Sequence, residues 1–83
     1  MLKPTHHARN RMRRDEVGLS DVEVCINNPD FTREQPHGRR DSWLRYGQRY
    51  LKVVHKREGQ DEVVITVIVK KRPPAMAAEG KED

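Results

Sequence analysis

The chain has 83 residues, of which 34% are hydrophobic and 36% are charged, and its formal net charge is +4. This length predicts one domain, and no apolar run approaches the roughly 20 residues that a membrane-spanning helix needs. The single cysteine, Cys25, excludes an internal disulfide and predicts a reducing, cytoplasmic location.

The positive charge is unevenly distributed along the chain. Residues 73–83 contain one Lys and three acids, a net charge of −2, so residues 1–72 carry +6. We expect residues 1–72 to form the single domain and residues 73–83 to be a disordered tail. A surplus of +6 favours an anionic partner such as nucleic acid, although a solvated surface explains it equally well.

A first helix is predicted from Thr5, its N-cap, to about Arg14. Ala8 and Met12 lie four residues apart and form a narrow apolar stripe along it. The adjacent stripe carries basic and titratable side chains at positions i, i+4 and i+7, namely His7, Arg11 and Arg14. These side chains are therefore expected at the edge of the buried surface.

A second helix is predicted from a capping-box sequence, Ser20-Asp21-Val22-Glu23, in which Ser20 is the N-cap. The helix is expected to end at Asn27-Asn28-Pro29. Its buried side chains are predicted to be Leu19, Val22, Cys25 and Ile26. Because Cys25 lies in this apolar stretch, we expect a buried, inert thiol.

The rest of the chain is typical of strands. Residues 30–41 indicate a loop or a short edge strand, and strands are predicted at 42–46, 49–56 and 62–70. Gly47-Gln48 fits a hairpin turn, and the last strand is expected to be central because it is apolar on both faces. The fold class is therefore α+β, with two N-terminal helices packed on one face of a three- to four-stranded antiparallel sheet. We expect His55 at the sheet surface.

The sequence contains no pattern typical of a metal site or of a phosphate-binding loop. The acids occur as neighbours, Asp15-Glu16 and Asp61-Glu62, and adjacent side chains point apart. No Cys/His spacing resembles a zinc site, and the glycines form no phosphate-binding loop. The sequence therefore predicts no metal and no cofactor.

Metal-free cleavage of RNA is compatible with the residues present. It needs a proton donor and acceptor near neutral pH, which histidine supplies, and cations that stabilise the phosphate, which arginine supplies. The candidate catalytic residues are His7, Arg11, Arg45, Lys52 and Thr66, and the candidate nucleic-acid-binding residues are Arg14, Tyr50, Lys70 and Lys71. Each of these residue types also fits an ordinary surface or packing role.

The order of several short motifs resembles a bacterial family. These motifs are His7-Ala8-x-x-Arg11-Met12, Gly18-Leu19-Ser20, Val22…Ile26-x-x-Pro29-Asp30, Arg49–Val54 and Val64–Ile68. The family is a small uncharacterised domain grouped with the RelE/ParE/BrnT-like toxins and the barnase–EndoU–colicin–RelE ribonuclease fold. The resemblance implies a RelE/ParE-like fold, metal-independent endoribonuclease activity and an antitoxin partner. His7 and Arg11 match the family's helix histidine and arginine.

Two functional hypotheses follow. The first is a toxin-like, metal-independent endoribonuclease that holds RNA on the open face of the sheet, with His7 as general acid or base. The alternative is a non-catalytic basic binding module, for nucleic acid or a gyrase-like partner, that keeps the toxin fold.

Overall fold

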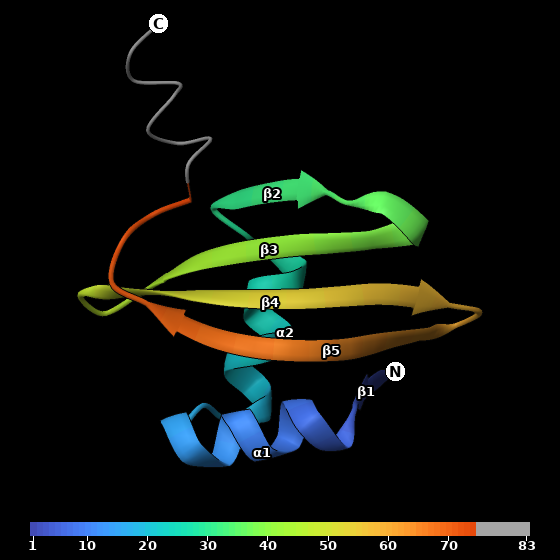
Figure 1. The fold of residues 1–83 in the computed structure, drawn as a ribbon, viewed down its shortest axis with the longest axis horizontal. Coiled ribbons are helices and arrows are strands. Elements are labelled where there is room, and N and C mark those ends of the chain that lie inside the picture. The colour runs from blue at the N-terminus through green and yellow to red at the C-terminus, as the bar shows by residue number, and fades with distance from the viewer. Residues whose placement is uncertain (75–83) are drawn as a thin grey trace, which may run out of the picture.

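The structure is a computed structural model, and it describes residues 1–74. Two helices and five strands form an α+β fold (Figure 1). In chain order the elements are β1 (Leu2–Pro4), α1 (His6–Asp15), α2 (Leu19–Asn27), β2 (Phe31–Glu34), the short 3₁₀ helix η1 (Pro36–Gly38), β3 (Arg39–Tyr46), β4 (Arg49–Glu58) and β5 (Asp61–Lys70). Of the predicted tail only Pro73 and Pro74 are described, and Pro74 is buried.

The sheet is five-stranded and mixed, with the order β1-β5-β4-β3-β2. β1 pairs in parallel with β5, whereas the other neighbours are antiparallel. The predicted three- to four-stranded antiparallel sheet is therefore wrong in the number of strands and in the direction of one of them. The parallel strand β1 was not predicted, because its three residues are too few to show an alternating pattern. The edge strand expected within 30–41 is present as β2, and β4, not β5, is the middle strand.

One face of the sheet is covered by both helices. α1 lies along β5, and α2 lies across β3 and β4 (Figure 1). The core between helices and sheet is one apolar cluster, made of Ala8, Met12, Val17, Val22, Cys25, Leu51, Val53, Val64 and Val67. The predicted stripe of Ala8 and Met12 and the burial of Cys25 are confirmed. No helix in residues 1–74 has the length and apolar character to cross a membrane.

The two helices begin differently. Thr5 caps α1 as predicted, since its hydroxyl accepts a hydrogen bond from Ala8 N at 3.1 Å. α2 begins at Leu19 with Gly18 as N-cap, and Asp21 Oδ2 accepts from Gly18 N at 3.1 Å. Ser20 is therefore not the N-cap, and Leu19, expected to be buried, is 49% exposed because it occupies the first turn.

A register shift in the β4–β5 pair decides which side chains face the helices. Val54 pairs with Thr66, but the next residue, His55, pairs with Val64, so Ile65 is an extra, bulged residue. The shift turns Val64 and every second residue before it to the covered face. It also explains why the run 63–69 is apolar without simple alternation.

The second face of the sheet, called the open face below, is covered by neither helix. Alternation along β3, β4 and β5, together with the observed register, gives this face Trp43, Arg45, Tyr50, Lys52 and Lys70. Leu51 and Val53, between these positions, point into the core. The sheet therefore has an apolar, helix-covered face and a face that carries basic side chains.

Candidate nucleic-acid interface

Cations and aromatic rings lie together on the open face, towards the end of the sheet that carries the β3–β4 turn. Lys52 Nζ lies 5.3 Å and Lys70 Nζ 5.9 Å from the centroid of the Trp43 ring. Although Trp43 belongs to the open face, it is only 6% exposed, because these long side chains cover it. On this surface, two ammonium groups therefore lie over the ring of Trp43.

Arg45 and Tyr50 form the neighbouring row. They are cross-strand partners, and the Arg45 guanidinium carbon lies 5.7 Å from the Tyr50 ring centroid. Arg45 Nε donates to the Gly47 carbonyl at 3.0 Å, and Arg45 N donates to Asp30 Oδ2 at 2.7 Å. These contacts hold the guanidinium in place, and its terminal nitrogens make no hydrogen bond within residues 1–74.

The open-face cations are sparsely neutralised. Lys52 lies 3.8 Å from Asp41 Oδ2, whereas Arg45 and Lys70 have no carboxylate partner among the described residues. The covered face differs, since Arg40 pairs with Glu34 at 2.7 Å. A polyanion on the open face would therefore meet cations that no carboxylate neutralises.

The predicted helix residues lie apart from this cluster. His7 is exposed in the first turn of α1, Arg11 is half-buried, and Arg14 is exposed and pairs with Asp15 at 3.4 Å. Within residues 1–74 neither His7 nor Arg11 makes a side-chain hydrogen bond or ion pair. α1 lies along β5, with β4 between it and the strand that carries Arg45.

The remaining predicted residues lie on β5 and directly after it. Thr66 belongs to the open face, but its hydroxyl is enclosed and has no hydrogen-bond partner in the described part of the chain. A phosphate would reach this hydroxyl only after a neighbouring side chain moved. Lys71 is exposed and follows Lys70, so it extends the basic surface past the strand end.

A hydrogen-bonded chain of polar side chains lies on the covered face, where none was expected. Ser42 Oγ lies 2.7 Å from His55 Nε2, and His55 Nδ1 lies 2.6 Å from Glu62 Oε2. His55 is 4% exposed, so its predicted surface position is wrong. Its alternation with Leu51 and Val53 is the signal in the sequence that places it with the core.

This Ser–His–acid chain has the connectivity of a nucleophile, a base and an orienting acid, but not their accessibility. Ser42 is completely buried, so its hydroxyl cannot reach a substrate. The nearby pocket, of about 390 Å³, is lined in part by His55 and by Arg57, which pairs with Glu62 at 3.2 Å. We therefore assign the chain a structural role, the satisfaction of buried polar atoms.

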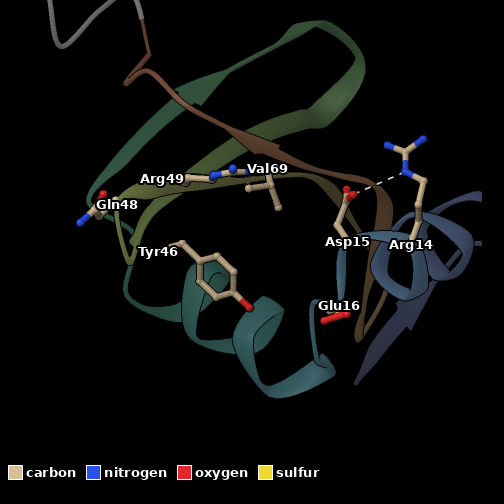
Figure 2. Close-up of a pocket in the computed structure, with 7 residues that line it drawn as sticks. All are labelled: Arg14, Asp15, Glu16, Tyr46, Gln48, Arg49 and Val69. Atoms are coloured by element: carbon tan, nitrogen blue, oxygen red, sulfur yellow. Dashed lines mark hydrogen bonds and ion pairs between the residues drawn. The ribbon is translucent and has the colours of Figure 1, made fainter.

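A second groove, of about 440 Å³, lies between the end of α1 and the β3–β4 turn (Figure 2). In Figure 2, Arg14 is joined to Asp15 at the helix side, whereas Gln48 comes from the turn and Arg49 from the start of β4. The Tyr46 hydroxyl donates to Asp21 Oδ2 at 3.0 Å, and burial, together with this hydrogen bond, raises the pKa of Tyr46. Because Asp15 and Glu16 balance the two arginines, this groove does not favour a polyanion.

Metal ligands do not gather in the described structure. Among residues 1–74 no three His, Cys, Asp or Glu side chains converge on one point.

Comparison with known proteins gives one match. Neither the curated proteins nor the solved structures contain a protein that matches this chain significantly. A family model described as a domain of unknown function, DUF4258, matches residues 5–69, which include α1, α2 and nearly all of the sheet. The chain is therefore a member of the DUF4258 family.

Proposed function

We propose that this domain binds single-stranded RNA on the open face of its sheet. The observation that carries the proposal is the cluster of Arg45, Lys52 and Lys70 over two aromatic rings, in which only Lys52 forms an ion pair among the described residues. Single-stranded nucleic acids are commonly bound by such combinations of cations and aromatic side chains. Tyr50 is half-buried beside Arg45, so part of its ring is accessible to a base.

The test compares two double variants that lose the same charge. Arg45→Ala/Lys70→Ala removes open-face cations, and Arg40→Ala/Arg57→Ala removes two cations that have carboxylate partners on the other face. Binding of a fluorescent single-stranded RNA is measured by anisotropy at several salt concentrations. We expect the first variant to bind at least tenfold more weakly at low salt, with a salt slope reduced by about 1.4, at about 0.7 per lost phosphate contact.

The control variant should bind within about twofold of the wild type, because its cations face away from the proposed interface. Equal weakening in both variants, or an absence of RNA binding by the wild type, contradicts the proposal. Circular dichroism of all three proteins verifies that each is folded.

Metal-independent cleavage of the bound RNA is a second candidate function. It is favoured by the stripe of exposed His7, half-buried Arg11 and exposed Arg14 on α1, which packs on the covered face of the same sheet. An exposed imidazole near a guanidinium can exchange protons near neutral pH. The resemblance of the helix motif to RelE/ParE/BrnT-like toxins implies this activity and an antitoxin partner.

Cleavage is tested with RNA in the presence of EDTA, using His7→Ala and, as the matched control, His6→Ala. Loss of a general acid or base lowers a rate by about 10²–10⁴-fold. We expect such a loss in His7→Ala and an unchanged rate in His6→Ala. RNA that stays intact with the wild type, or equal rates in both variants, rules out this mechanism and leaves the binding proposal standing.

A further inference from the structure

A groove of about 400 Å³ opens on the open face beside the cation cluster. It is lined by Asp30, Phe31, Arg45 and Tyr50. Its volume lies within the range of small-molecule sites, and it combines two aromatic rings with a cation and an acid. This combination suits a nucleobase, since a ring system needs flat apolar contacts and a few polar groups at its edge.

The aromatic contacts come from the two strands that flank β3. Phe31, at the start of β2, pairs with Trp43, and Tyr50, at the start of β4, pairs with Arg45. Both Phe31 and Tyr50 are half-buried, so each is anchored in the sheet and exposes part of its ring. Stacking on such rings contributes about 1–3 kcal/mol for each base and does not distinguish one base from another.

Asp30 supplies the discrimination between bases that stacking lacks. Asp30 Oδ2 accepts from Arg45 N at 2.7 Å, while Oδ1 makes no hydrogen bond within residues 1–74. The same residue is fixed at its backbone, since Asp30 N donates to the Trp43 carbonyl at 2.8 Å. An ionised carboxylate only accepts hydrogen bonds, so its partner at a base edge must be a donor.

Guanine satisfies this requirement best. Its Watson–Crick edge has two adjacent donors, N1–H and the 2-amino group, whereas adenine and cytosine each present one amino donor beside a ring acceptor. Uracil presents one donor between two carbonyl oxygens, which a carboxylate repels. Arg45 lies at the same groove, so its free guanidinium nitrogens are placed for a phosphate of the same strand.

From this geometry we infer that the groove between Phe31 and Tyr50 is a guanine-selective subsite for single-stranded RNA, with Asp30 as the selecting residue. The inference rests on the proposed RNA-binding function and adds base preference to it. Lys52 and Lys70 then bind neighbouring phosphates along the sheet.

The test uses ten-nucleotide uridine RNAs with guanosine, inosine or adenosine at the centre, together with the all-uridine RNA. We expect the wild type to bind the guanosine RNA about fivefold to tenfold tighter than the adenosine RNA. Inosine keeps N1–H but lacks the 2-amino group, so its RNA should bind with intermediate affinity.

Asp30→Asn tests the selecting residue. The amide keeps an oxygen that can accept from Arg45 N, so the fold is preserved, but it replaces the second acceptor with a donor. We expect the guanosine preference to fall below twofold, while the all-uridine RNA binds as well as before or better, because a negative charge has been removed. Glu23→Gln removes a charge from an exposed position of α2 and should retain the full preference.

The outcomes separate the two proposals. If the wild type binds all four RNAs equally, or if Asp30→Asn keeps the preference, the guanine subsite is wrong and RNA binding stands. If the wild type binds none of them, the proposed function itself is wrong.

Discussion

Burial determines the reactivity of the Cys25 thiol. Its thiol is inaccessible in the core and lies 3.3 Å from the Ser42 carbonyl oxygen, to which it donates. Burial, with a contribution from the Asp30 charge, raises the pKa of Cys25 from 9.0 to about 12. The thiolate is therefore disfavoured at neutral pH, which makes Cys25 a poor nucleophile.

The raised pKa predicts a loss of stability in alkali. Because the folded pKa exceeds the unfolded value, this contribution is fully present below pH 9 and is lost as the pH rises towards 12. Urea unfolding at pH 8 and pH 10.5 should show that the wild type loses about 2 kcal/mol more than Cys25→Ala does. The other titrating groups are present in both proteins. Equal losses of unfolding free energy in the two proteins would therefore show that Cys25 does not cause the loss of stability in alkali.

At the scale of elements, Thr5 joins helix α1 to the bulge of β5. Its hydroxyl accepts from Ala8 N at 3.1 Å and donates to the Ile65 carbonyl at 3.0 Å. Its backbone N donates to the Val64 carbonyl at 2.9 Å. One residue thus caps the helix and satisfies the backbone at the irregular position of the sheet, which fixes α1 along β5.

Removal of the Thr5 hydroxyl should therefore cost more than removal of an ordinary surface hydroxyl. We expect Thr5→Ala to lower the free energy of unfolding by about 1–2 kcal/mol, measured by urea denaturation. Thr5→Ser keeps the hydroxyl and should recover most of the loss. Ser20→Ala, at the N-cap position expected from the sequence, should change stability by less than about 0.5 kcal/mol; a larger effect there than at Thr5 would refute the observed caps.

At the scale of the whole molecule, the two faces of the sheet differ in how their cations are neutralised. Arg40 and Arg57 on the covered side have carboxylate partners in Glu34 and Glu62. Arg45 and Lys70 on the open face have none within residues 1–74. Unpaired cations are thus exposed on the face that carries aromatic rings, and salt should weaken the binding of an anionic ligand there.

Local signals in the sequence were sufficient to predict most of the helices, strands and turns. The Thr5 cap, the apolar stripe of Ala8 and Met12 and the Gly47-Gln48 turn are correctly predicted, because neighbouring residues determine caps, helix faces and short turns. β1 was missed, since three residues carry no period, and Ser20 was misassigned because Asp21 makes the cap contact with Gly18.

The α+β class and the burial of Cys25 follow from the sequence alone, since periodicity and propensity are local properties. The fold was needed to show that His55 lies between Ser42 and Glu62, that Asp30 lies in a groove with Arg45 and Tyr50, and that α1 lies along β5. These arrangements depend on strand register, and the one-residue bulge at Ile65 changes the face of the sheet to which every earlier residue of β5 points.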